Sequence, residues 1–333
     1  MRSHVRPRPG IATGLAGMAA ACWLGVLAHP ARPWRLVPRD DAQAPALPDP
    51  APPVGVVVPA RNEADVLPRT LGALSAQRYP GRVRIIVVDD RSDDGTADVA
   101  RRVGGGRVEV VRGAPLPHGW VGKVWALHQG VERLLFDGDP PRYLLATDAD
   151  ILHAPDSLAR LVREAEGLGL DLTSRMARLR CSSPAERLLI PPFVLFFNLL
   201  YPMVWANRRS SRVAAAAGGC MLLRRRALER AGGYAAIRSA LIDDLALAAA
   251  IKRSGGTARL SVSTGVVASL RAYDDLGSIW RMVRRSAYTQ LRRNPALLAG
   301  VTVVLCVMFA GPPLGVLAGV RGALSGRAAR AWA

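Results

Sequence analysis

Three pairs of aspartates stand out in this otherwise strongly basic chain, because each pair follows a strand-like run or opens a helical pattern. The pairs are Asp89 and Asp90 after VRIIVV, Asp148 and Asp150 after YLLAT, and Asp243 and Asp244 in ALIDDLALA. In an open α/β sheet, ligands bind beyond the carboxyl ends of the strands, so carboxylates placed there face a common crevice. The pattern therefore predicts a metal-assisted nucleotide site.

Apolar sequence is concentrated in three stretches, at residues 11–28, 188–206 and 296–320. About twenty apolar residues cross a bilayer once. We expect an uncleaved N-terminal membrane anchor within residues 1–30 and a transmembrane segment at 296–320. The middle stretch contains three prolines, which favours a membrane-associated or acceptor-channel element over a straight span, with a buried core helix as the alternative.

The formal net charge of +19 comes almost entirely from arginine, and the only lysines are Lys123 and Lys252. No basic groove with interleaved aromatic residues is visible, and the arginines cluster beside apolar segments, where they can meet anionic lipid headgroups. We therefore expect no nucleic-acid partner. The four cysteines show no paired spacing, so neither a disulfide framework nor a zinc site is indicated.

A folded domain is expected at residues 54–275, after a proline-rich linker at 31–53. Its first part alternates between strand and helix patterns. Strands are predicted at 54–58, 83–89, 107–111 and 143–147, and helices at 62–77, from 93–96 onward, and at 125–135. This order predicts an α/β fold with a mostly parallel central sheet and flanking helices. Beyond Asp150 the pattern is mixed, with strands in 171–179 and 220–224 and a helix from Asp244 to Gly255.

Residues 276–295 form a basic amphipathic pattern immediately before the last apolar stretch. Such a helix is expected to lie in the plane of a membrane interface. A helix that packs on the core of the soluble domain is an equally good interpretation.

The first two predicted strands end in PARNE and VDDRSDDGT, and these turns resemble the nucleotide-binding half of the family 2 glycosyltransferases. The resemblance implies a GT-A-type nucleotide-diphospho-sugar transferase fold, here with membrane helices added. It also implies that Asp90 reads the base of the donor with support from Asp89. A carboxylate at this place can accept a hydrogen bond from a uracil N–H, which favours a UDP-sugar. Glu63 would meet the ribose or an adjacent polar group, and Pro59 and Ala60 belong to the same turn.

Asp148-Ala-Asp150 matches the D-x-D element of that family, in which carboxylates hold a divalent cation against the donor diphosphate. Hard oxygen ligands suit Mg²⁺ or Mn²⁺. We expect Asp150 to be the metal ligand, with Asp148 at the nucleotide sugar. Gly122-Lys123 resembles a G-K segment of the family whose lysine lies near the donor phosphates. A solvated lysine at a helix start is the alternative.

Gly218 and Gly219 resemble a glycine-containing strand that forms the floor of the acceptor side in the family. Glycine there permits close approach of the backbone to the substrate. Asp243 and Asp244 occupy the place of its acidic pair, whose second member is the catalytic base. By this resemblance Asp244 is the base and Asp243 orients it, whereas ordinary helix capping is the alternative for both. The Q-x-x-R-W element of processive members is missing around Arg284, which argues against polymer synthesis.

Longer strings narrow the resemblance to the hopene-associated glycosyltransferases, bacterial membrane proteins linked to hopanoid lipids. They include GAPLPHGW, TDADI, HAPDSL, AERLLIP and AAAGGCM, and the similarity extends from about Val54 to Pro295. Arginines just before the last apolar stretch place that side in the cytoplasm by the positive-inside tendency. We thus expect a bacterial inner-membrane protein whose catalytic domain is cytoplasmic.

The leading hypothesis is an inverting, metal-dependent glycosyltransferase that moves a sugar from a nucleotide-diphosphate donor to a lipid acceptor related to hopanoids. Transfer to a polyprenyl phosphate or to a polysaccharide is the alternative within the same enzyme class. A noncatalytic membrane scaffold of hopanoid assembly is the alternative from another class. The presence of Asp90, Asp150 and Asp244 together argues against the scaffold, because an inactive protein need not keep all three.

Overall fold

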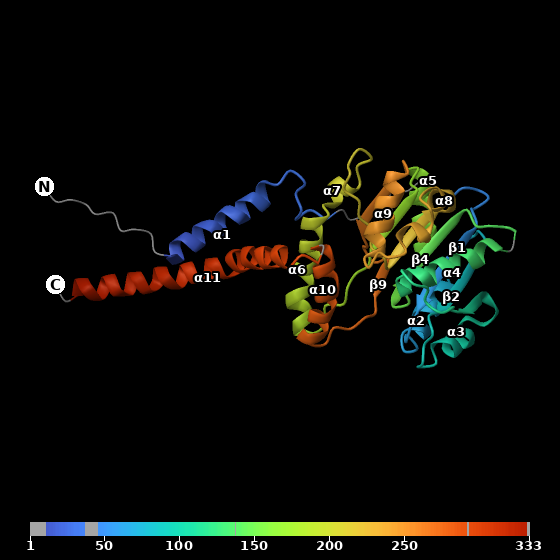
Figure 1. Cartoon of the computed structure of the whole chain (residues 1–333), viewed down its shortest axis with the longest axis horizontal. Coiled ribbons are helices and arrows are strands. Elements are labelled where there is room, and N and C mark those ends of the chain that lie inside the picture. The colour runs from blue at the N-terminus through green and yellow to red at the C-terminus, as the bar shows by residue number, and fades with distance from the viewer. Residues whose placement is uncertain (1–10, 37–45, 137, 292, 332–333) are drawn as a thin grey trace. The chain divides into compact units, whose positions relative to one another are not determined.

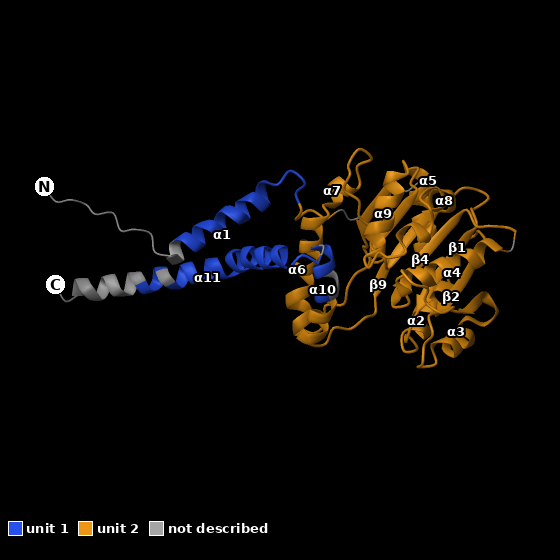
Figure 2. Ribbon diagram, viewed as in Figure 1, with its two compact units in different colours: residues 1–32, 284–333 blue, residues 33–283 orange. Residues whose placement is uncertain are grey.

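The computed structural model of the chain describes residues 11–36, 46–136, 138–291 and 293–331 (Figure 1). Two compact units are distinguished in Figure 2. One comprises residues 1–32 and 284–333, and the other comprises residues 33–283. All predicted site residues belong to the second unit.

A seven-stranded sheet forms the centre of the second unit, in the order β3-β2-β1-β4-β7-β6-β8. The strands are β1 (Val54–Ala60), β2 (Val83–Asp89), β3 (Val108–Arg112), β4 (Tyr143–Thr147), β6 (Leu172–Met176), β7 (Cys220–Arg224) and β8 (Ala258–Val262). Strand β1 pairs in parallel with both β2 and β4, and β2 pairs in parallel with β3. Only β7 runs antiparallel to its two neighbours. The sheet is therefore mostly parallel, as the alternating pattern predicted.

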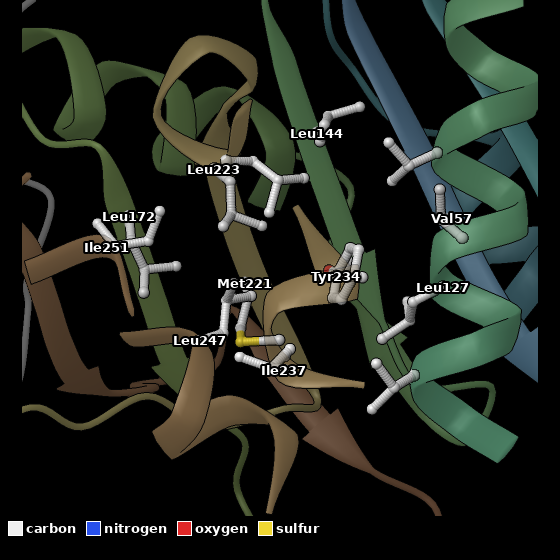
Figure 3. Packing of buried hydrophobic residues seen from close by; sticks show 14 of the residues in the cluster. Val57, Leu127, Leu144, Leu172, Met221, Leu223, Tyr234, Ile237, Leu247 and Ile251 are labelled. Atoms are coloured by element: carbon white, nitrogen blue, oxygen red, sulfur yellow. The ribbon is translucent and has the colours of Figure 1, made fainter. Parts of the chain in front are cut away.

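Successive residues of each central strand point to opposite faces of the sheet, which explains why these strands are apolar throughout. Val57, Ile86 and Leu144 belong to a cluster with α4 (Gly122–Phe136) and α9 (Asp243–Arg253), part of which Figure 3 shows. Their strand neighbours pack on the other side against α2 (Leu67–Ser75), α3 (Thr96–Gly104) and α5 (Ser157–Gly167). The core is thus two helical layers around one sheet.

Helix α2 begins at Leu67, five residues later than the sequence pattern predicted. The reason lies in the preceding turn, where Asn62 has a φ of +55° and the backbone N–H groups of 62–64 donate to side chains of the neighbouring turn. Helix α4 begins at Gly122 instead of residue 125, so Lys123 lies in its first turn. The strand expected at 171–179 is limited to β6.

Two short strands, β5 (Ile151–His153) and β9 (Val267–Ser269), form a separate antiparallel pair beside the sheet. They join the D-x-D turn to a segment more than one hundred residues later in the chain. The short helices of this unit include α7 (Met203–Ala206) and α8 (Arg225–Arg230), together with 3-10 turns at Gly105–Arg107 and Tyr234–Ile237.

Two helices expected to be membrane-associated belong wholly or partly to the second unit. Helix α6 (Pro184–Leu200) covers most of the middle apolar stretch and contains Pro191 and Pro192. Helix α10 (Leu276–Gln290) covers the basic amphipathic pattern, but its first turns have a mixed environment. Ile279 is buried, whereas Leu276 and Trp280 are more than 60% exposed. One face of this helix therefore packs on the domain, and the interfacial location of its exposed face stays a prediction.

The other unit pairs α1 (Ile11–Ala28) with α11 (Pro295–Ala331). The indole of Trp23 donates to the carbonyl of Met308 and stacks edge-on against Phe309. Residues 295–321 are long and apolar enough to cross a membrane. Part of the expected anchor, residues 1–10, and part of the expected linker, residues 37–45, lie outside the described residues.

Gly130 tests the close contact between α4 and the sheet. A Cβ atom added there would lie 2.3 Å from Val57 Cγ1 and 3.1 Å from Val88 Cγ2. We expect Gly130→Ala to lower the free energy of unfolding by ~1–3 kcal/mol, because β1 must shift to admit the methyl group. Thermal unfolding of the full chain in detergent, followed by tryptophan fluorescence, measures the effect.

Gly72 in α2 is the matched control, since nothing lies within 4 Å of a Cβ added there. Gly72→Ala should be neutral or raise stability by up to about 1 kcal/mol through helix propensity. Equal effects of the two alanines would contradict the proposed tight contact.

Candidate active site

The carboxyl ends of β1, β2 and β4 meet at one edge of the sheet, and the predicted site residues follow these ends. Register places Ala60, the last residue of β1, beside Asp89, the last residue of β2. Strand β4 ends at Thr147, directly before the D-x-D turn. Parallel pairing thus brings two of the three aspartate pairs to one edge, and the third lies at the start of α9.

The turns after β1 and β2 are held together by side chains of the second turn. Ser92 Oγ accepts from Asn62 N–H, Thr96 Oγ1 accepts from Glu63 N–H, and Asp94 Oδ2 accepts from Ala64 N–H. The hydroxyl of Thr96 also donates to Asp94, and this bond lowers the pKa of the Asp94 carboxyl. Ser92, Asp94 and Thr96 of the D-x-S-x-D-G-T pattern therefore hold the two turns together, which leaves Asp90 and Glu63 available to a ligand.

Asp90 lies in a partly buried position close to Gly122. Its N–H donates to the Ala60 carbonyl at 2.8 Å, and its Oδ2 would be 3.1 Å from a Cβ added at Gly122. Burial raises the pKa of Asp90, while Arg61, 3.8 Å away, opposes that shift. Asp89 is 5% exposed and accepts from the Ser92 N–H, so it shapes the turn beneath Asp90.

The D-x-D turn is fixed from below by a buried polar chain. Thr147 Oγ1 donates to the Gly219 carbonyl and lies 2.8 Å from His153 Nε2, so the residues on both sides of the turn are joined. Burial lowers the pKa of His153 to about 4, which keeps the ring neutral at physiological pH. The hydroxyl of Thr70 donates to the Ala149 carbonyl from α2. The turn is thereby fixed at this edge, with Asp148 partly exposed and Asp150 buried.

Lys123 forms a cationic bridge between two of the aspartate pairs. Its Nζ lies 2.7 Å from Asp148 Oδ1 and 3.3 Å from Asp243 Oδ2. Burial alone would lower the pKa of this lysine, but the neighbouring carboxylates outweigh burial and raise it. Lys123 is therefore charged and ties the D-x-D turn to the start of α9. The side chain thus lies among the predicted site residues and contacts two of their carboxylates, and its expected place near the donor phosphates stays a prediction.

Asp244 is oriented by two backbone donors. Its Oδ2 accepts from Gly218 N–H at 2.8 Å, and its Oδ1 accepts from Leu245 N–H at 2.7 Å. Burial, together with the nearby Asp243 carboxylate, raises its pKa to about 6 despite these bonds and Lys123. A carboxyl group with this pKa is suited to accept a proton near neutral pH.

Gly218 and Gly219 lie where side chains would disturb the site. A Cβ on Gly218 would be 2.9 Å from Lys123 Nζ and 3.4 Å from Asp244 Oδ2. A Cβ on Gly219 would press on Ile151 at 3.0 Å. Glycine thus permits close packing at both positions, and the acceptor-side role expected for them stays a prediction.

Arg271, which no motif indicated, joins the predicted site residues Glu63 and Asp150. Its Nη2 contacts Glu63 Oε1, and its Nε lies 3.2 Å from Asp150 Oδ2, which also accepts from Ser269 Oγ at 2.9 Å. Burial raises the pKa of Glu63, although Arg271 opposes the shift. The chain carries 45 lysines and arginines, so only the β5–β9 pairing could have singled out this one.

The residues of the D-x-D turn fit a divalent cation by their chemistry. No group of three or more His, Cys, Asp and Glu side chains forms a ready-made metal site in the described ranges. However, Asp148 and Asp150 offer hard carboxylate oxygens on neighbouring positions, and no described hydrogen bond or ion pair uses Asp150 Oδ1. Such donors suit Mg²⁺ or Mn²⁺ when a bound ligand completes the coordination.

Lys123→Met tests the cationic bridge by removing the charge while keeping the length of the side chain. We expect a loss of about 1–3 kcal/mol in the free energy of unfolding at pH 7.5, because Asp148 and Asp243 lose their shared counter-ion at a partly exposed position. Because the pKa of Lys123 is raised, its contribution to stability is fully present at pH 7.5 and is lost only as the pH rises through that raised pKa. At acid pH the contribution falls for a different reason, because the partner carboxylates lose their charge.

Thermal unfolding at pH 7.5 and pH 4 measures this difference, and Lys123→Arg serves as the charge-retaining control. A loss for Lys123→Met that is equal at both pH values would show that packing, not charge, explains the role of this residue.

Comparison with known proteins matches residues 55–232 to the model of glycosyl transferase family 2. A 4,4'-diaponeurosporenoate glycosyltransferase of Staphylococcus haemolyticus is 38% identical over 98 residues, which are 29% of this chain and 24% of that protein. An N-acetylglucosaminyltransferase of Rhizobium leguminosarum is 32% identical over 139 residues, 41% of this chain and 31% of that protein. The matches thus span less than a third of the length of these relatives.

Among solved structures, the fold is similar to a mannosyltransferase from Pyrobaculum calidifontis in complex with GDP-Man and Mn²⁺. The TM-score is 0.55 at 21% identity, over 96% of this chain and 92% of that one. This likeness confirms the expected GT-A-like α/β fold with its mostly parallel sheet. The expectation of a family 2 enzyme is confirmed as well, because the family model covers more than half of the chain: this protein belongs to glycosyl transferase family 2.

Proposed function

We propose that this protein is an inverting, metal-dependent glycosyltransferase that moves a sugar from a nucleotide-diphosphate donor to a lipid acceptor. The observation that carries the proposal is the gathering of five carboxylates, those of Glu63, Asp90, Asp148, Asp150 and Asp244, around one sheet edge of a protein with a net charge of +19. An acidic site in a basic chain suits a cation that in turn binds an anionic diphosphate.

The donor half of the site is assigned to the turns after β1 and β2. Asp90 would accept a hydrogen bond from the base, which favours UDP, with Asp89 supporting the turn and Glu63 near the ribose. Pro59 and Ala60 bring the end of β1 against Asp89 and so define the floor of this half. A divalent cation held by Asp150, with Asp148 beside it, would neutralise the charge that builds on the leaving diphosphate.

Asp244 is the proposed base of the transfer step. It takes the proton from an acceptor hydroxyl while that oxygen forms a bond to the anomeric carbon. The bond from that carbon to the diphosphate oxygen breaks, and its electron pair leaves with the diphosphate. The two backbone N–H groups at Asp244 hold the carboxylate in place, and Asp243 with Lys123 controls the local charge.

A lipid acceptor and a membrane location are supported by surface apolar residues. Among the described residues, one helix segment, 295–321, is apolar and long enough to cross a bilayer, with a mean hydropathy of 2.2 over its best window. In the second unit, Leu188 in α6 and Leu276 and Trp280 in α10 are each more than 60% exposed. Arg281 and Arg284 follow on α10 and could meet anionic headgroups, whereas the side chains of Arg285 and Arg292 lie outside the described residues.

We further propose a bacterial inner-membrane location with the catalytic unit on the cytoplasmic side, where the basic residues before α11 would lie. A hopanoid-related acceptor is favoured by the resemblance to the hopene-associated glycosyltransferases. One relative is, by its name, a glycosyltransferase of the lipid-related compound 4,4'-diaponeurosporenoate. Polyprenyl phosphate is the alternative acceptor, and the missing Q-x-x-R-W element disfavours polysaccharide.

Asp244→Asn tests the base directly. We expect transfer of radiolabelled sugar from a panel of nucleotide sugars into organic-soluble lipid to fall by about 10²–10⁴-fold, because a general base is lost. For the unaltered protein, kcat/KM should fall as the pH drops below about 6, where the raised pKa of Asp244 leaves the carboxyl protonated.

Asp98→Asn, at a position 82% exposed on α3, is the control and should leave transfer unchanged. Transfer that survives Asp244→Asn would refute the assignment of the base. Donor binding without any transfer by the unaltered protein, across all donors and lipid acceptors, would favour the scaffold alternative.

Trp280 tests membrane contact of the catalytic unit. In vesicles that contain brominated lipid, quenching should remove much of the emission that Trp280 contributes, since its exposed indole would lie among the lipids. The emission of Trp280 is obtained as the difference between the emission of the unaltered chain and that of Trp280→Phe.

Trp125→Phe provides the comparison, because that indole packs on Trp120 and donates to the Ala114 carbonyl inside the second unit. Its emission should be largely unquenched. Equal quenching of the two contributions, or none for Trp280, would count against an interfacial α10.

A further inference from the structure

The proposed function needs the carboxylate of Asp150 to be available to a metal, but Arg271 is paired with that carboxylate. Its guanidinium contacts Glu63 in the turn after β1 and lies 3.2 Å from Asp150 Oδ2 in the D-x-D turn. Asp150 is the residue assigned to the divalent cation, and its side chain is only 10% exposed. A cation of the protein itself therefore already neutralises the proposed metal ligand.

The backbone that carries Arg271 is fixed on both sides, whereas its side chain is about half exposed. Before it, Ser269 pairs with Ile151 in the β5–β9 ladder, and Leu270 N–H donates to the Asp150 carbonyl. After it, Tyr273 N–H donates to Glu186, whose carboxylate is fully buried. Movement at this position is therefore confined to the side chain of Arg271, which can rotate without a shift of the chain.

Charge repulsion determines how the Arg271 side chain responds when a divalent cation binds. A divalent cation on Asp150 would lie within a few ångströms of the guanidinium, and two positive charges at that distance repel each other strongly in a partly buried site. Asp150 Oδ2 accepts from both Ser269 and Arg271, so losing Arg271 leaves the carboxylate still held by Ser269. The ion pair can thus open without disordering the turn.

We propose that Arg271 is an exchangeable counter-ion: it holds Asp150 and Glu63 together in the empty site, gives up Asp150 to the divalent cation, and then binds a phosphate oxygen of the donor diphosphate. This inference rests on the proposed function. The planar guanidinium, with its forked donors, fits a phosphate group and remains within reach of the same edge. Arg271 is accordingly a positioning residue for the donor as well as a competitor of the cation.

The test compares Arg271→Gln with the unaltered full chain in three binding measurements. Free Mn²⁺, followed by electron paramagnetic resonance without nucleotide, should bind several-fold more tightly to the variant, because a competing charge is gone. UDP or GDP at saturating Mn²⁺, followed by calorimetry, should bind roughly 10- to 100-fold more weakly, the range expected for a lost charge-assisted hydrogen bond. Uridine or guanosine should bind equally to both proteins.

Two further variants sharpen the result. Arg69→Gln removes one positive charge at an exposed position of α2 and should change none of the three affinities. Arg271→Lys keeps the charge and loses the fork, so Mn²⁺ binding should stay near that of the unaltered protein while the nucleoside diphosphate binds more weakly. Opposite signs for metal and diphosphate are the signature, and a residue that only supports the fold would weaken both.

The outcomes separate this inference from the proposed function. If the unaltered protein binds neither nucleoside diphosphate in the presence of Mn²⁺, the donor site itself is wrong. If it binds one of them, and Arg271→Gln leaves Mn²⁺ affinity unchanged or weaker, the exchange is refuted while the donor site stands. Equal losses for the nucleoside and its diphosphate would likewise refute a contact to phosphate.

Discussion

The parallel pairing of β1 with β2 and β4 is the constraint on which the rest of the site depends. Parallel strands end at the same edge, so the turns after Ala60, Asp89 and Thr147 are brought together whatever their side chains prefer. The carboxylates gathered there repel one another, and their burial is tolerated because basic side chains lie between them. The fold thus brings several negative charges together, and basic side chains within the site reduce their mutual repulsion.

Lys123 and Arg271 reduce this repulsion in the same way, by pairing with carboxylates of the D-x-D turn and its surroundings. Each contacts one aspartate of the turn and one carboxylate elsewhere, Asp243 for the lysine and Glu63 for the arginine. The result is a site that is organised before any ligand arrives and remains net acidic. Asp244 lies beside this arrangement, with a pKa raised to about 6, and so combines a fixed position with readiness to accept a proton.

The mostly parallel sheet, its flanking helices and the acidic turns could be predicted because they depend on local signals. Runs such as VRIIVVD are apolar at successive positions because helices cover both faces of the sheet. Aspartates at or after the ends of such runs mark the ends of the strands. Arg271 could not be predicted, since it reaches the site only through the pairing of β9 with β5, which is set by tertiary contacts. The late start of α2 was missed for a similar reason: Ser92, Asp94 and Thr96 hold residues 62–64 from another turn.

The most direct test of the account is an experimental structure of the full chain with Mn²⁺ and a nucleoside diphosphate, with the metal located by its anomalous signal. The account predicts the metal on Asp150, the base at Asp90, and the diphosphate between the D-x-D turn and Arg271. A nucleotide bound elsewhere, or at this edge with its base away from Asp90 and its metal away from Asp150, would contradict the central claim that these strand ends form the donor site.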